Sequence, residues 1–267
     1  MFELLRYDFF QNALISTLLI SISCGLVGTY IVAKRMVFIS GGITHASFGG
    51  LGVSYYLGFS PLIGATVFSV FSALSILFLS DNKKLREDSL IGIFWSAGMA
   101  IGVLFIYLTP GYAPNLMSYL FGNILTVTTG MIIMSALLCL IIIGFFLLFY
   151  RPLFYIAFDK EYSRTHNIPV NTIDVCITLI IALCIVLCMK LAGIILIISY
   201  LTIPQAIAGL FYKNFKQLLI ASSVISSAGS VIGLFLSAWL NIPSGATIVI
   251  CFLIVFLLAW CWKKITR

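Results

Sequence analysis

The sequence predicts an all-α fold, a polytopic bundle of about nine transmembrane helices, and three observations carry this prediction. Hydrophobic residues make up 62% of the 267 residues and charged residues only 9%, whereas soluble domains carry about 25% charged residues. Apolar stretches of about 20 residues, the length that crosses a bilayer as a helix, recur along the chain. Basic residues gather in the short connections between these stretches, where they orient a chain in the membrane.

The predicted spans are joined by short connections, and no polar linker is long enough to separate two folded units. We therefore treat residues 1–267 as a single transmembrane domain. Residues 1–11 mix charged and large apolar side chains, a pattern typical of an interfacial helix. Residues 110–125 are expected to form a loop with a short helix at 117–121. The nine spans are predicted at residues 13–33, 36–57, 61–79, 90–108, 126–150, 172–189, 192–212, 217–240 and a last stretch that ends at Trp262.

Nine spans place alternate connections on opposite sides of the membrane and segregate the basic residues. Thirteen of the fifteen Lys and Arg residues then lie on one side, and only Arg6 and Lys190 on the other. The side with the excess is expected to face the cytoplasm, so the N-terminus lies outside and the C-terminus inside. The net charge of +7 is thus explained by membrane orientation. No basic, aromatic-interleaved soluble face is present for nucleic acid to use.

The second predicted span carries an ionisable side chain near its centre. His45 is one of only two histidines, and an ionisable group at mid-span usually faces a cavity, a pathway or a partner. The alternative is a structural histidine bonded to a backbone carbonyl. Gly41 and Gly49 lie one turn either side of His45 and Gly52 continues that face, which leaves room beside the ring. Gly42 and Gly50, with Ala46 between them, form a second stripe of small residues suited to close helix packing.

The seven cysteines all lie within or at the edge of apolar stretches. None forms a CxxC pair, so neither a zinc knuckle nor a disulfide framework is expected. Cys184 and Cys188 lie one helical turn apart and offer a soft-metal site as an alternative. Packing is the favoured interpretation, because free cysteine behaves as a small buried hydrophobe.

Residues 151–174 form the longest polar segment of the chain. Asp159 is placed to cap the start of a helix, and Asn167 suits the left-handed conformation that ends one. A short amphipathic helix at the cytoplasmic face is therefore predicted, and His166 is expected to be a solvated surface residue. Such a helix rests on lipid headgroups or fits the groove of a protein partner. Asp159 and Glu161 disfavour anionic lipid, which favours the partner.

Five segments in the correct order resemble the membrane permease subunits of bacterial ABC transporters that import zinc, manganese or iron. The resemblance covers nearly the whole chain. It rests on the basic turn and histidine-bearing span, an LFG-x-IL sequence, a coupling-helix sequence ending in Asn-Ile-Pro-Val, a Gly-to-Pro span, and a last outer turn. These segments are residues 34–50, 120–127, 157–170, 191–206 and 240–247.

The resemblance implies a set of partners and residue roles. It implies two copies of a cytoplasmic ATPase, a second permease copy that makes a homodimer or close pair, and an extracytoplasmic metal-binding protein, all at the bacterial cytoplasmic membrane. It also implies a cytoplasmic coupling loop and helix at 151–171 and a pathway packed by the glycines of the histidine-bearing span and by Pro204. The residues implied to dock on the ATPase are Phe158, Asp159, Glu161, Tyr162, Arg164 and Asn167.

Two positions depart from the pattern of this family. Many members carry an aspartate four residues before the histidine, where this chain has Gly41, so the implied metal ligands differ here. The glycine usual at the end of the coupling helix is Asn167, which the same left-handed geometry accepts.

The residues themselves point to a transport path rather than an enzyme. The sequence has no GxxxxGK[ST] phosphate loop, so ATP would act only through the partner, and no permanently bound cofactor is expected. In a two-fold dimer both copies of His45 can face the axis, and imidazole suits zinc, iron, nickel and copper ions. Hydroxyls of Ser40, Thr44 and Ser47 are candidate additional ligands. A weak site suits transport, because the ion must leave as readily as it enters.

Three other functions remain as alternatives. A secondary carrier driven by an ion gradient usually holds carboxylates near the midplane, but all eight acidic residues lie near span ends or in connections. An intramembrane enzyme needs a constellation of groups within reach of one another, which one histidine does not supply. An ABC permease for a chelated metal or vitamin is the nearest rival, and the short chain with its histidine motif favours a bare ion.

Overall fold

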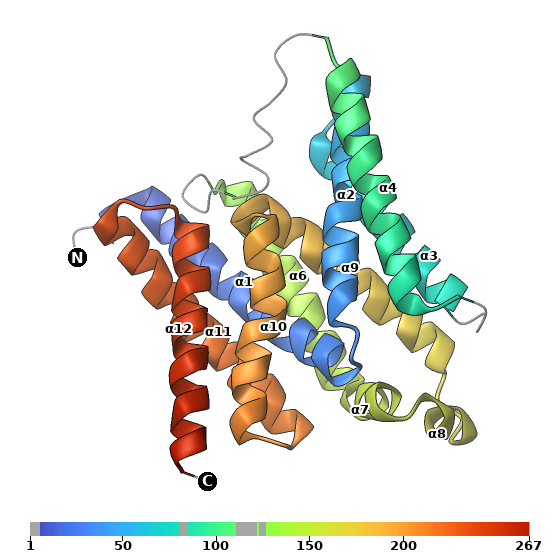
Figure 1. The fold of residues 1–267 in the computed structure, drawn as a ribbon, viewed down its shortest axis with the longest axis vertical. Helices are drawn as coiled ribbons and strands as arrows, with labels where there is room; N and C mark the ends of the chain where they lie inside the picture. The colour runs from blue at the N-terminus through green and yellow to red at the C-terminus, as the bar shows by residue number, and fades with distance from the viewer. Residues whose placement is uncertain (1–5, 81–84, 111–121, 123–126, 267) are drawn as a thin grey trace.

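A computed structural model describes residues 6–80, 85–110, 122 and 127–266 of the chain (Figure 1). All regular elements in these ranges are helices, so the predicted all-α class is confirmed. They are α1 (Asp8–Ala33), α2 (Val37–Leu57), α3 (Pro61–Ser80), α4 (Glu87–Leu108), α6 (Thr129–Leu148), α7 (Tyr150–Phe158), α8 (Lys160–Thr165), α9 (Val170–Ala192), α10 (Ile194–Phe211), α11 (Phe215–Leu240) and α12 (Ser244–Ile265).

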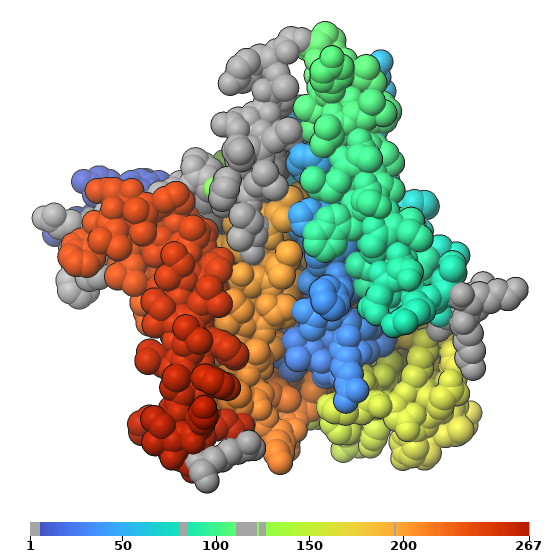
Figure 2. Space-filling model, viewed as in Figure 1, coloured from blue at the N-terminus to red at the C-terminus, as the bar shows by residue number. Residues whose placement is uncertain are grey.

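The helices pack as two groups that meet along the centre of the molecule. Helix α2 packs against α3 and α4, while α1 packs against α11, α10 and α6. Helix α9 contacts α3 on one side and α1 on the other, and α1 and α9 are the most buried of the apolar helices. Figure 2 shows α4 and α12 at opposite outer edges, with part of α2 at the surface between α4 and α10.

Seven of the described helices are long and apolar enough to cross a membrane: α1, α3, α4, α6, α9, α11 and α12. The predicted count of nine spans is therefore not confirmed. Helix α2 has the length of a span, but glycines, hydroxyls and His45 dilute its apolar content. Helix α10 qualifies only as a shorter apolar helix.

The N-terminal segment differs from the prediction. The structure begins α1 at Asp8, so residues 8–11 are continuous with this helix rather than part of a separate interfacial helix. Asp8 suits the first turn because its carboxylate meets the positive end of the helix dipole. Phe10 is fully buried and packs edge-on against Phe235 of α11, at a ring-centroid distance of 5.2 Å, which anchors this first turn.

The polar segment after α6 is also more ordered than predicted, because it contains two helices. Only the second, α8, was expected. A single residue, Phe149, separates the end of α6 from the start of α7, which buries Leu153 and Ile156 on one face. The predicted loop at 110–125 and its short helix at 117–121 lie outside the described residues, except for residues 110 and 122.

Proline 204 lies inside α10 without ending it. A proline has no N–H, so the carbonyl of Tyr200, four residues earlier, loses its usual helical donor. The side-chain Nε2 of Gln205 donates to that carbonyl at 3.1 Å and also to the carbonyl of Cys24 in α1 at 3.0 Å. The neighbouring glutamine thus replaces the missing bond and links α10 to α1.

Candidate metal site and coupling segment

The imidazole of His45 projects from the middle of α2 onto α4. It stacks on the indole of Trp95 with ring centroids 4.2 Å apart and planes 9° apart. Its Nδ1 atom is buried and has no hydrogen-bond partner in the part of the chain that the structure describes. The structure therefore shows none of the bonding to a backbone carbonyl through Nδ1 that a structural histidine would use.

The same indole ring limits the space for a side chain at position 41, where this chain has glycine. A Cβ atom built on Gly41 would lie 3.2 Å from Cζ3 of Trp95, which is tighter than ordinary contact. Trp95 thus covers both His45 and the position one turn before it. Nothing in the sequence around Trp95 indicates this role, because the two rings meet only once α2 and α4 pack.

The three hydroxyls predicted as additional ligands are fully buried. Each donates to a carbonyl of its own helix: Ser40 to Val37, Thr44 to Ser40 and Ser47 to Thr44. At about 100° per residue, all three lie roughly 100° or more around α2 from His45. Within one chain the structure does not bring them together with the imidazole, and their role as ligands stays a prediction.

The glycines of α2 mark where neighbouring backbones come closest. Cβ atoms on Gly49 and Gly52 would meet backbone atoms of Gly98 and Gly102 in α4, and one on Gly50 would meet the backbone of Gly64 in α3. Such glycine-to-glycine contacts let helices approach closely in a membrane. Gly42 serves the same end, since a Cβ there would press on Ile91 of α4.

The predicted capping of the short helix that follows Asp159 is confirmed. The carboxylate of Asp159 accepts a hydrogen bond from the Tyr162 amide at 2.9 Å, which caps the start of α8. Asn167 has a φ of +56°, and the Ile168 amide reaches back to the Ser163 carbonyl at 3.2 Å. This pattern ends a helix through a left-handed residue, and it explains why asparagine can stand where glycine is usual.

Helix α8 and the last residue of α7 present aromatic and charged side chains to the outside. Phe158 is 59% exposed and Tyr162 45% exposed, while Arg164 pairs with Glu161 at 3.0 Å on the same surface. An open groove of about 250 Å³ lies beside this helix. His166 is exposed as predicted and stacks on Tyr162, with ring centroids 4.0 Å apart.

A buried carboxylate ties this segment to two long helices. Asp174, near the start of α9, is only 2% exposed, and its two oxygens pair with Lys34 of α1 at 2.7 Å and Lys160 of α8 at 3.1 Å. The hydroxyl of Tyr30 donates to the same carboxylate at 3.5 Å. Asp174 was not singled out in the sequence, although an acidic residue at the edge of an apolar stretch is a usable signal.

One glycine of the LFG-x-IL sequence can be placed. Gly122 has a φ of +64°, and a Cβ atom there would overlap the backbone at Ala192 and Gly193, where α9 meets α10. The position therefore requires glycine both for its conformation and for the close approach. Two of the segments that carry the resemblance thus meet in space.

Comparison with known proteins agrees with this architecture. The chain is 42% identical to an uncharacterized membrane protein of Synechocystis sp., over 99% of this chain and 94% of that protein. It is 32% identical to the manganese transport system membrane protein MntC of Halalkalibacterium halodurans, over 97% and 88%. The solved structure of PsaBC from Streptococcus pneumoniae in complex with Fab superposes with a TM-score of 0.85 at 30% identity, over 96% and 92%.

These relatives are named as membrane proteins, and the seven apolar helices identify this chain as an integral membrane protein as well. The family model described as the ABC 3 transport family matches residues 6–263. The resemblance to ABC metal permeases is thereby confirmed, and the chain belongs to the ABC 3 transport family.

Proposed function

We propose that this chain is the permease subunit of an ABC importer for a divalent transition metal ion, with manganese as the first candidate and zinc and iron as the others. The observation that carries the proposal is His45, an imidazole in the middle of α2 whose buried Nδ1 has no hydrogen-bond partner among the described residues. Membership in the ABC 3 transport family and the printed function of the MntC relative support it. The chain itself is a transport subunit, and a separate ATPase supplies the energy.

The metal path would form between two copies of the chain. In the proposed dimer, both copies of His45 face the two-fold axis and bind the ion transiently with water, because one imidazole per chain is too little for a tight site. Trp95 would have to move aside when the ion passes, since its ring covers the imidazole. The glycines of α2 and the proline-containing α10 pack the walls of this path.

The proposed topology has nine spans, with α2 and α10 included, the N-terminus outside and the C-terminus in the cytoplasm. The segregation of basic residues supports it. In Figure 1 the C-terminal end of α12 lies at the same end of the molecule as α7 and α8, in keeping with one cytoplasmic face. Helices α2 and α10, which are not among the seven clear spans, pack against those apolar helices, and this packing supports counting both as spans.

Helix α8 is the proposed docking element for the ATPase. Its exposed Tyr162 and the neighbouring Phe158 at the end of α7 offer an apolar contact, and its Arg164–Glu161 pair offers a polar rim. Asp174 would carry motion from α8 into the bundle, because its carboxylate joins this helix to α1 and α9. The proposed complex contains two permease copies, two ATPase copies and an extracytoplasmic metal-binding protein.

The test is replacement of His45 with alanine in the complex reconstituted with its ATPase into vesicles. We expect His45→Ala to abolish Mn²⁺ uptake and Mn²⁺-stimulated ATP hydrolysis, while the ATPase still co-purifies with the permease. The matched control is His166→Ala, which removes the exposed histidine just after α8 and should leave uptake intact. Normal uptake by His45→Ala would remove this residue from the path.

A further inference from the structure

Three buried thiols meet where α1 and α9 pack, outside the metal path proposed above. Cys24 belongs to α1, and Cys184 and Cys188 lie one turn apart on α9. The sulfur of Cys188 lies 3.5 Å from that of Cys24 and 4.0 Å from that of Cys184, and all three sulfurs lie within 4.8 Å of one another. We propose that this thiol cluster binds a soft divalent cation of the zinc class.

The spacing of the sulfurs suits a shared metal ion. A zinc–sulfur bond is about 2.3 Å long, so three sulfur ligands around one ion stand about 4 Å apart. The separations of Cys188 from Cys24 and Cys184, 3.5 and 4.0 Å, lie within 0.5 Å of this value, and the remaining separation is at most 4.8 Å, differences that side-chain rotation can absorb. Cys24, Cys184 and Cys188 are at most 2% exposed, so the ligands are held in place before the ion arrives.

The two helices are fixed by contacts that do not involve the thiols. The carbonyl of Cys24 accepts a hydrogen bond from Gln205 at 3.0 Å, which ties this turn of α1 to α10. Met189, next to Cys188, accepts a hydrogen bond from Ser47 of α2 through its sulfur at 3.2 Å. The cluster is therefore framed by α1, α2, α9 and α10, and its sulfurs need no rearrangement of the helices to bind.

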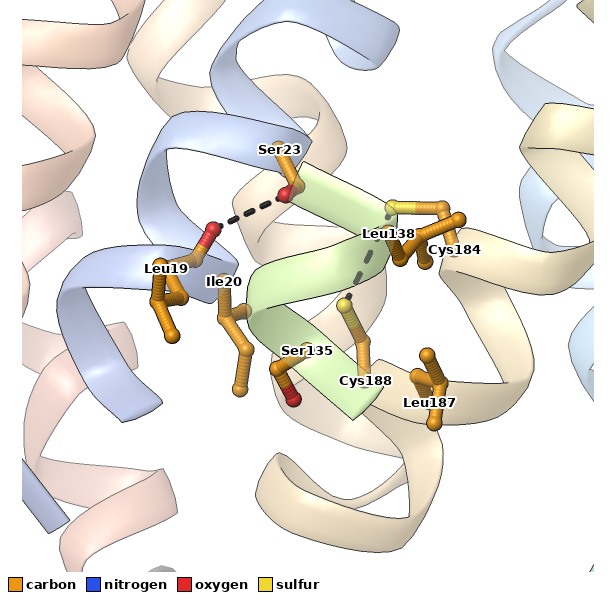
Figure 3. A pocket seen from close by; sticks show the side chains of 8 residues that line it. All are labelled: Leu19, Ile20, Ser23, Ser135, Leu138, Cys184, Leu187 and Cys188. Carbon is orange, nitrogen blue, oxygen red and sulfur yellow. Dashed lines mark hydrogen bonds between the residues drawn. The ribbon is translucent and has the colours of Figure 1, made fainter. Parts of the chain in front are cut away.

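A small cavity gives the cluster room for one further ligand. Cys184 and Cys188 line a space of about 10 Å³ together with Ser23 of α1 and Ser135 of α6, and Figure 3 shows both cysteines directed to this space. A cavity of this size holds about one water molecule. A water there would complete the four ligands that zinc prefers.

Charge decides which kind of cation fits. A divalent ion that displaces the protons of two thiols, with the third thiol remaining neutral, gives a complex without net charge and releases two protons. Burial of an uncompensated charge in an apolar interior is costly, so this neutral complex is favoured. Mn²⁺ prefers oxygen ligands, whereas thiolates select soft ions, and the cluster would therefore not bind the ion proposed for the His45 path.

The experiment uses the full-length chain in detergent and Cd²⁺ as the probe, because thiolate–cadmium bonds absorb in the ultraviolet. We expect one Cd²⁺ per chain with this absorption, release of two protons per ion, and competition by Zn²⁺ but not by Mn²⁺. Cys184→Ala should abolish the absorption. Cys251→Ala, which removes a buried cysteine of α12, is the matched control and should retain it.

Two further variants keep the proposal testable. Cys24→Ala removes the ligand on the other helix and should abolish the absorption too, so the test stands if Cys184→Ala fails to fold. His45→Ala should bind Cd²⁺ at the thiols as before, which separates this site from the proposed transport path. An unchanged thiolate absorption in both Cys184→Ala and Cys24→Ala, or Cd²⁺ binding by the wild-type chain without that absorption, would overturn the proposal.

Discussion

The indole of Trp95 occupies the space that a side chain at position 41 would need. The indole lies against the imidazole of His45 on one part of its surface, and a side chain at position 41 would press on its edge. In relatives with an aspartate at this position, the carboxylate would stand one turn from the histidine. Here the ring takes that place, so the first contact of an incoming ion would be with an aromatic cover rather than with a carboxylate.

This matching of Gly41 and Trp95 predicts that their substitutions are coupled. Gly41→Asp alone should lower the free energy of unfolding of the full chain in detergent by about 1–3 kcal/mol, because the new side chain overpacks against the ring. In the Trp95→Ala background the same change should cost less, with a coupling energy of at least about 0.5 kcal/mol. Effects that simply add would contradict the shared space.

The residues of this site differ in how far the sequence reveals them. His45 can be found from the sequence because an ionisable group in an apolar stretch is a local signal. Trp95 cannot, since tryptophan in an apolar helix has no distinguishing neighbour and its partner lies on another helix. Asp174 is intermediate: its position is visible in the sequence, but its two lysine partners come from α1 and α8.

At the scale of helices, α2 depends on glycines that permit backbone contact. We predict that Gly52→Ala destabilises the chain by about 1–3 kcal/mol, because the added methyl group meets the backbone of Gly102, which cannot rotate away. Gly92→Ala in α4 is the matched control: no atom of the described residues lies within 4 Å of its added Cβ, and the higher helix propensity of alanine favours it. Thermal unfolding in detergent measures both, and equal losses of stability would contradict the packing role.

The carboxylate of Asp174 predicts a link between helices. Asp174→Asn should cost about 1.5–3 kcal/mol, because it weakens charge-assisted hydrogen bonds and leaves two lysines close together. Asp88→Asn, which breaks an exposed pair with Arg86 at 3.8 Å, should cost less than about 1 kcal/mol. Stability in detergent tests the first part, and ATP hydrolysis stimulated by the metal tests the proposed transmission. Wild-type values of both for Asp174→Asn would contradict the link.

The two short helices show why one element was predictable and the other was not. Helix α8 carries its own start and stop signals in Asp159 and Asn167, and both act within a few residues. Helix α7 follows α6 after a single residue, so its apolar face reads in the sequence as a continuation of the preceding span. Only its packing, with Leu153 and Ile156 turned to the core, separates it from α6.

At the scale of the whole molecule, the number of spans depends on the shorter helix α10 and on α2. The features that make this helix a candidate path, its glycines, hydroxyls and histidine, are the same features that lower its apolar content below that of the seven clear spans. In the proposed topology α2 crosses the membrane and lines the path, and hydropathy underestimates such a helix because α3 and α4 pack against it and shield it from lipid. The distribution of Lys and Arg over the connections provides a second criterion: these residues gather on one side of the membrane only if α2 crosses it.

This argument predicts that the two ends of α2 face opposite sides of the membrane. In a Cys261→Ser background, which removes the exposed native cysteine, Arg35→Cys should react with a membrane-impermeant thiol reagent only from the cytoplasmic side. Phe59→Cys, just past the other end of α2, should react only from outside. Labelling of intact cells and of inverted membrane vesicles measures this. If both positions reacted from one side, α2 would not span the membrane. The orientation of all later helices would then reverse, and the basic residues would no longer gather on one side, contrary to the charge asymmetry that supports the proposed topology.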